Sequence, residues 1–134
     1  MEKTLVLIKP DAVERNLIGK IITFYEEEGL KVVNLKLVQI TKDFAEKHYS
    51  VHKGKIFYDE LIQYITRSPL CAMVLQGEDV IEKVRKVNGA TNPDEAQFGT
   101  IRRCYGIDKT QNCVHASDSI KNAKEEIKLW FGSN

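Results

Sequence analysis

The alternation of hydrophobic and polar positions predicts a small set of β-strands joined by helices. Short apolar runs bounded by polar, Gly or Pro residues predict strands at 4–8, 30–40, 70–77 and 112–116. Within the second run, Val33, Leu35 and Leu37 recur at a period of two and are expected to share one face. The third run is apolar throughout and is typical of a buried, central strand.

Apolar residues at helical spacing predict the connecting elements. The expected helices, one of them beginning at a capping Thr41, are 11–29, 41–49, 57–65, 78–89 and 119–131. The polar segment 88–111 contains several glycines and is expected to be a long functional loop. This order of elements predicts an α+β fold, a ferredoxin-like sandwich with a four-stranded antiparallel sheet (βαββαβ) and extra helices. No linker or repeat divides the chain, so residues 1–134 are expected to form a single domain.

Composition narrows the classes of function. The formal charge is +1, from 20 basic and 19 acidic residues, which argues against a general polyanion binder and gives no reason to expect specific nucleic-acid binding. The apolar run near the N-terminus is too short for a signal peptide or a membrane span, so no membrane partner is expected. The three cysteines lack metal-binding spacing and are expected to be reduced and mostly buried in a cytoplasmic protein.

The segment NCVHASDS at 112–119 carries the strongest chemical signal. His115 ends an apolar run, and the following hydroxyl and carboxylate side chains cap a helix N-terminus, where free N–H groups favour an anion. By itself, a histidine at a strand end is more often structural, and His48 and His52 are expected to be solvated surface residues. However, His115 could supply a nucleophile, and Lys9 and basic residues elsewhere could supply cations. Transfer of a phosphoryl group requires both. Neither a P-loop nor a dinucleotide-binding glycine motif is present.

Four motifs resemble those of the nucleoside diphosphate kinases. They are KPDAV at 9–13, ATNPDEA at 90–96, FGTIR at 98–102 and NCVHASDS at 112–119. The similarity runs from Thr4 to Phe131 in the family's order and spacing, and the N-x-x-H-[GA]-S-D pattern is highly specific in that setting. The resemblance implies transfer of the γ-phosphate of a nucleoside triphosphate, usually ATP, to a nucleoside diphosphate. It also implies ping-pong kinetics through a phosphohistidine on His115, with Mg²⁺ bound to the nucleotide.

The same resemblance assigns roles to individual residues. His115 would be the nucleophile, oriented by Glu126 with support from Ser117, while Lys9 would contact the γ-phosphate and the ribose beside Tyr49. The residues that would bind the nucleotide phosphates, the sugar and the base are Lys9, Arg85, Thr91, Arg102, Asn112, Phe57 and Leu61. Asp118 would reach Mg²⁺ through water, the ion being held mainly by the nucleotide phosphates.

The chain departs from the family pattern inside the expected loop. Phe98 stands where many members have proline, Arg103-Cys104-Tyr105 replaces a GDF sequence, and Lys109 replaces an apolar residue that commonly covers the base. The last expected helix ends close to Asn134, without the extension of many eukaryotic members. We therefore expect a bacterial-type homo-oligomer, a hexamer or tetramer built from dimers. Two alternatives remain, a catalytically silent nucleotide-binding relative and a ferredoxin-like nucleic-acid-binding module.

Overall fold

A four-stranded antiparallel sheet forms the centre of the computed structural model, which describes residues 2–132. Its strands are β1 (Glu2–Ile8), β2 (Lys31–Val38), β3 (Leu70–Gly77) and β4 (Val114–Ala116), in the spatial order β2-β3-β1-β4. Every neighbouring pair is antiparallel. β1 and β3 lie at the centre and are apolar on both faces, as their uninterrupted hydrophobic runs predict. The predicted ferredoxin-like α+β fold is confirmed.

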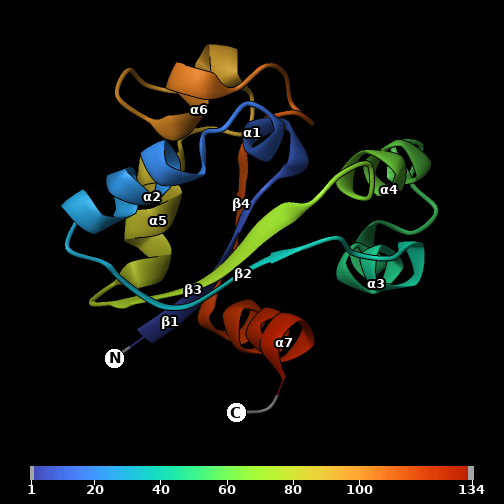
Figure 1. Cartoon of the computed structure of the whole chain (residues 1–134), viewed down its shortest axis with the longest axis horizontal. Helices are drawn as coiled ribbons and strands as arrows, with labels where there is room; N and C mark the ends of the chain where they lie inside the picture. The colour runs from blue at the N-terminus through green and yellow to red at the C-terminus, as the bar shows by residue number, and fades with distance from the viewer. Residues whose placement is uncertain (1, 133–134) are drawn as a thin grey trace.

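Helices cover both faces of the sheet (Figure 1). One face packs against α1 (Pro10–Glu14), α2 (Ile18–Glu27), α5 (Val80–Asn88) and α6 (Ile101–Tyr105). The other packs against α3 (Lys42–His48), α4 (Tyr58–Ile65) and α7 (Ile120–Phe131). Alternate residues of β1 enter the two cores, because successive side chains of a strand point to opposite faces. The strand therefore holds both layers together.

The helix expected at 11–29 is in fact two helices. α1 ends at Glu14, and Asn16 adopts a left-handed conformation with φ 60° before α2 begins at Ile18. The Arg15 side chain donates to the Asp11 carbonyl and carboxylate and to the Tyr105 carbonyl, which holds this break against α6. A left-handed residue ends a helix because the i to i−4 ladder cannot continue through it.

One connection needs correction, and edge strand β2 has an exposure that the sequence did not predict. β2 forms, but Leu35 and Leu37 are 50% and 63% exposed, because β2 lies at the edge of the sheet, where the helices cover it only in part. A bulge between Val32 and Asn34 also shifts its pairing with β3. The segment 88–111 is more ordered than a loop: it contains a 3₁₀ turn at Pro93–Glu95 and helix α6, each begun by a capping side chain.

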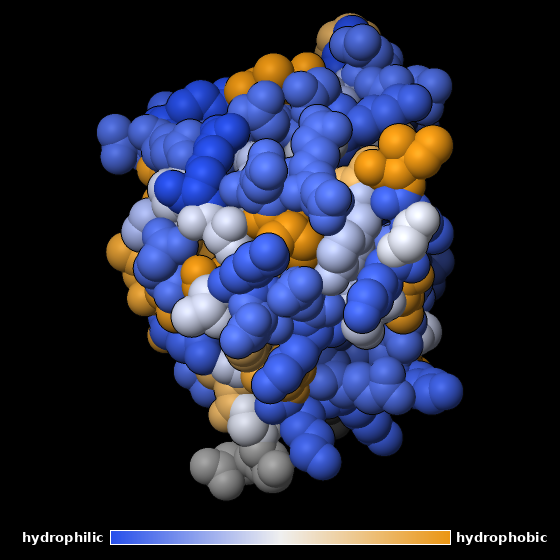
Figure 2. Space-filling view, turned by 90° about the vertical axis from the view of Figure 1, so that its right-hand side faces the viewer, coloured by the Kyte–Doolittle hydropathy of each residue, from blue (hydrophilic) through white to orange (hydrophobic). Residues whose placement is uncertain are grey.

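The molecular face that carries α3 and α4 is mainly hydrophilic, with apolar atoms in small, separate patches (Figure 2). Exposed apolar side chains in the connection between these helices are Val51, Ile56 and Phe57. All three cysteines are free thiols, with Cys71 and Cys113 buried and Cys104 exposed, as the sequence led us to expect. No helix within residues 2–132 is long and apolar enough to cross a membrane.

Candidate active site

His115 lies in the short edge strand β4, opposite Leu7 of β1. Its Nε2 is 3.1 Å from Oε1 of Glu126, which projects from α7, and the Ser117 hydroxyl donates to the same oxygen at 2.7 Å. The Leu5 backbone N–H in turn donates to the Ser117 hydroxyl, so the sheet itself positions the carboxylate. Because a carboxylate accepts hydrogen bonds, the proton of a neutral His115 resides on Nε2. Nδ1 then keeps a lone pair, and His115 can act as a nucleophile there.

The charge of Glu126 is stabilised by these same contacts. Burial alone would raise the pKa of Glu126, but the hydrogen bonds and charge interactions with His115, together with the hydrogen bond from Ser117, hold this pKa below its usual range. The carboxylate is therefore ionised over the whole physiological range. An ionised carboxylate at Nε2 stabilises the positive charge that the imidazole acquires when Nδ1 forms a bond.

Lys9 is a buried cation at the end of β1. Pro10 begins α1 directly after it. The Lys9 ammonium donates to Asn112 Oδ1 at 2.9 Å and to the Thr110 carbonyl at 3.2 Å. Burial, reinforced by the nearby Arg102 charge, lowers the pKa of Lys9 to about 8. The Asn112 amide donates to the Thr91 carbonyl at 3.0 Å and thereby joins the connection after α5 to the residues before β4. Within residues 2–132, the Lys9 ammonium thus donates only to neutral oxygens.

Arg102, from α6, joins the end of α5 to β4. Its guanidinium donates to the carbonyls of Gly89 at 2.8 Å and Val114 at 2.7 Å, while its buried Nε has no partner within residues 2–132. Burial is the main cause that lowers its pKa, and the Arg85 charge acts in the same direction. The Arg85 and Arg102 guanidinium groups and the Lys9 ammonium line the same cavity as His115.

These side chains share a cavity of about 670 Å³. The predicted site residues that line it are Lys9, Tyr49, Leu61, Arg85, Thr91, Arg102, Asn112, His115, Asp118 and Glu126. Ser117 is buried beneath it and contacts Glu126. Phe57 is outside the lining and 45% exposed, at the residue before α4, so the structure does not bring it together with the others. A cavity of this size can hold a small ligand, and its cationic wall suits phosphates.

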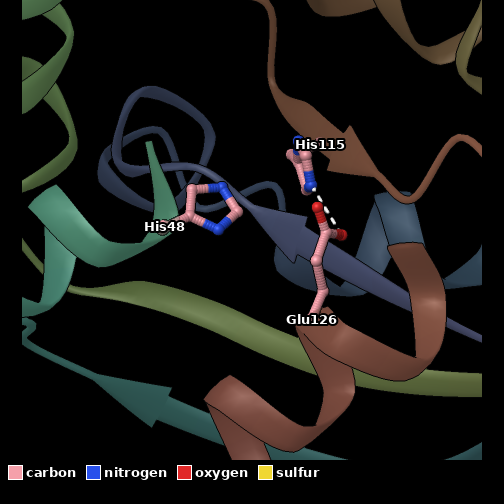
Figure 3. A group of neighbouring side chains, drawn as sticks. All are labelled: His48, His115 and Glu126. Carbon is pink, nitrogen blue, oxygen red and sulfur yellow. Dashed lines mark hydrogen bonds and ion pairs between the residues drawn. The ribbon is translucent and has the colours of Figure 1, made fainter. Parts of the chain in front are cut away.

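The expectation that His48 and His52 are solvated is wrong for His48. His48 is half-buried, lines the cavity, and lies with its ring 4.8 Å from that of His115 (Figure 3). It also accepts a hydrogen bond from Trp130. His52 lines the same wall but is only partly covered. The signal in the sequence was the spacing of Phe44, Ala45, His48 and Tyr49, which places His48 on the inner face of α3.

The donors at the mouth of the cavity fit a hydrated divalent cation. Asp118 is an exposed carboxylate on the cavity wall, and its Oδ1 accepts a hydrogen bond from Asn122. A single carboxylate together with phosphate oxygens is the donor set that Mg²⁺ commonly uses, since it keeps several waters. The closer group of His48, His115 and Glu126 has two imidazoles, which are donors preferred by transition metals.

Comparisons with known proteins agree with this geometry. The family model described as nucleoside diphosphate kinase matches residues 2–134. A protein of that name from Clostridium perfringens is 63% identical over 131 residues, covering 98% of this chain and 92% of the relative. One from Staphylococcus epidermidis is 53% identical, covering 100% of this chain and 90% of the relative.

Solved structures agree as well. A nucleoside diphosphate kinase from Encephalitozoon cuniculi superposes with a TM-score of 0.97 at 41% identity, covering 99% of this chain and 90% of the other. A halophilic one from Halobacterium salinarum, in complex with CDP, gives 0.96 at 42% identity, covering 98% and 88%. The chain therefore belongs to the nucleoside diphosphate kinase family.

Proposed function

We propose that this chain, as a single domain of residues 1–134, transfers the γ-phosphate of ATP and other nucleoside triphosphates to nucleoside diphosphates through a phosphohistidine on His115. The observation that carries this proposal is the hydrogen bond between His115 Nε2 and Glu126, which leaves Nδ1 as the free nucleophilic nitrogen. Membership of the nucleoside diphosphate kinase family gives the reaction class, phosphoryl transfer between nucleotides.

In the first half-reaction, the Nδ1 lone pair attacks the γ-phosphorus. The N–P bond forms as the bond to the β–γ bridging oxygen breaks, and that electron pair leaves with the diphosphate. The proton on Nε2 stays in place, and the Glu126 carboxylate stabilises the positive charge shared over the ring. In the second half-reaction, a terminal oxygen of the acceptor diphosphate attacks the same phosphorus and regenerates neutral His115. The two halves are nearly symmetrical, so ping-pong kinetics follow.

The cationic wall would bind the phosphates. Lys9 would exchange its neutral oxygen partners for the γ-phosphate and the ribose hydroxyl, with Tyr49 beside it, and Arg85 and Arg102 would neutralise the developing charge. Thr91 would hold the phosphates and Asn112 the sugar. Leu61 would contact the base together with Phe57, whose ring lies beyond the present cavity lining. The CDP bound to the related Halobacterium protein supports nucleotide binding in this fold.

Nucleoside diphosphate kinases generally use a divalent metal with their nucleotides. We infer that the ion here is Mg²⁺ and that Asp118 reaches it through water, since this exposed carboxylate lies at the cavity mouth. When bound, Mg²⁺ would neutralise phosphate charge. The side chains of this protein would then orient the nucleotide so that its γ-phosphate lies next to His115.

Edge strand β2 supports the proposal of a homo-oligomer. Its unpaired edge carries exposed Val33, Leu35 and Leu37, an apolar strand edge that a second copy of the chain could cover. This face would form the dimer from which a hexamer or tetramer is built. The three free thiols suit a reducing, cytoplasmic location.

The proposal is tested by mixing the protein with Mg²⁺ and ATP labelled on its γ-phosphate, without an acceptor. We expect acid-labile, alkali-stable label on His115, removed by any nucleoside diphosphate. The matched control is His115→Asn, which should fold but take up no label. If the folded wild-type protein stays unlabelled, the proposal is wrong, and the silent nucleotide-binding alternative replaces it.

A further inference from the structure

The hydrogen bond between Trp130 and His48 defines where the His48 proton resides. The indole Nε1–H of Trp130 lies 3.2 Å from His48 Nδ1. An indole nitrogen can only donate, so Nδ1 must be the acceptor. A neutral imidazole that accepts at Nδ1 carries its proton on Nε2, and a doubly protonated imidazole would have no acceptor for Trp130. The bond therefore selects one tautomer of neutral His48.

Packing between α3 and α7 holds this pair in place. Trp130 is buried, and the Phe44 ring packs edge-on against it at 4.7 Å between centroids. The Lys36 ammonium also donates to the Trp130 carbonyl. Figure 3 shows His48 pointing from α3 toward His115 and Glu126. Its ring meets the His115 ring edge-on, with an angle of 79° between their planes. Two elements far apart in the sequence thus orient His48 toward the nucleophile.

We propose that His48 is a neutral hydrogen-bond donor, through Nε2–H, to the phosphoryl group transferred to and from His115. This inference rests on the proposed function, since it needs a phosphoryl group at His115. His48 and His115 line the same cavity, and a ring nitrogen of each lies within 4.8 Å of the other and of a Glu126 oxygen. Because the two rings meet edge-on, a phosphoryl group bonded to His115 would have its oxygens close to the His48 ring. His48 neither gains nor loses a proton in this role.

The same tautomer explains why only one of two neighbouring histidines is a nucleophile. The Nδ1 lone pair of His48 accepts from Trp130, and its Nε2 carries the proton, so neither nitrogen is free to attack phosphorus. A metal bridging His48 Nε2, His115 and Glu126 would require the opposite tautomer of His48 and would break the bond to Trp130. The hydrogen bond therefore favours donation to an anion over metal binding.

Burial, together with the charged groups around it, keeps His48 neutral. Burial lowers the pKa of His48 to about 3, and the charges of His115, Lys9 and His52 act in the same direction, opposed by Glu126. Tyr49, whose ring lies 4.7 Å from that of His48, is itself neutral, because burial and the Glu126 charge raise its pKa. A neutral donor suits this position because it binds a phosphoryl oxygen without adding another cation next to His115.

The tautomer can be measured in the unphosphorylated protein, independently of any kinase activity. Imidazole ¹⁵N NMR should show His48 protonated on Nε2 alone, without titration between about pH 5 and 8. Trp130→Phe should yield mixed tautomers, whereas the control Phe44→Leu, which disturbs the same packing but leaves the indole N–H, should keep one. A wild-type His48 protonated on Nδ1, or titrating like a solvated histidine, would overturn the proposal.

The role in transfer is tested by the single-turnover rate of His115 phosphorylation by ATP. His48→Phe keeps an aromatic ring without the donor and should slow this step about 10- to 100-fold, with little change in ADP affinity. His48→Gln places an amide N–H near the position of Nε2 and should recover most of the rate. An unchanged rate in His48→Phe would overturn the proposal even if the tautomer is correct. Absence of phosphohistidine in the wild-type protein would instead contradict the proposed function.

Discussion

The two walls of the cavity handle charge in opposite ways. On the wall formed by Lys9 and Arg102, the cations donate to neutral carbonyl and amide oxygens, and neither forms a salt bridge with a carboxylate of residues 2–132. On the wall formed by β4, α3 and α7, Glu126 accepts from both His115 and Ser117. The cations of the first wall therefore have no carboxylate partner in the described part of the chain. On the second wall, the Glu126 carboxylate balances positive charge and fixes the proton of His115 on Nε2.

This difference separates binding from chemistry. An uncompensated, desolvated cation gains most from an incoming phosphate, because it has few competing partners. A nucleophilic imidazole instead needs one nitrogen free of its proton and a stable place for the positive charge that develops. The predictions below test whether the two walls can be altered independently.

The largest effect is expected from His115→Ala. Removing the nucleophile should lower the steady-state rate of phosphoryl transfer by about 10⁴-fold or more, since no other side chain can take its place. Binding of ADP with Mg²⁺ should persist, because the cations are on the other wall. Isothermal titration calorimetry on the variant measures this directly, and complete loss of ADP binding would contradict the separation of the walls.

Lys9→Ala should give the next largest effect. Loss of the ammonium that faces the transferred phosphate should slow transfer by about 10²- to 10³-fold, a typical result of removing one preorganised donor. The variant should also unfold at a slightly lower temperature, because Asn112 Oδ1 loses its hydrogen-bond donor. The matched control is Lys47→Ala, which removes a cation from the outer lining of the same cavity and should change the rate far less. A wild-type rate in Lys9→Ala would remove this residue from the mechanism.

Much of the fold could be predicted because its determinants are local. The all-apolar run of β3, the helical spacing and terminal Gly89 of α5, and the capping Thr41 of α3 each specify their element within a few residues. The break at Asn16 was missed because its stabilising contact, from Arg15 to the Tyr105 carbonyl, joins residues distant in sequence. The exposure of Leu35 depends on strand order, which periodicity does not encode.

The site shows the same division. The motifs around Lys9 and His115 identified two residues that the fold brings to one cavity. His48 was missed because an isolated histidine in a charged segment is usually solvated, and its burial depends on Trp130 from the last helix. Phe57 lies outside the cavity lining, so its assignment to the base remains a prediction.

Glu126→Ala tests the balanced wall. Without the carboxylate, His115 loses the partner that keeps its proton on Nε2 and stabilises its developing charge, so the turnover number should fall about 10- to 100-fold. The Michaelis constant for the nucleotide should change little, because the phosphate-binding cations are intact. Steady-state kinetics separate these quantities. A rise in the Michaelis constant with an unchanged turnover number would mean that Glu126 acts in binding instead.

The smallest effect concerns the uncompensated wall and pH. Since the pKa of Lys9 is lowered to about 8, its charge in the free protein is lost as pH rises through that value. kcat/KM should therefore fall about fivefold between about pH 8 and 9, as expected for one ionisation. kcat should decline only at higher pH, because bound phosphates favour the charged ammonium and raise its pKa. In Lys9→Arg, whose guanidinium stays protonated, the fall in kcat/KM should disappear. If the fall persists in Lys9→Arg, another group causes it, and burial lowers the pKa of Lys9 less than expected.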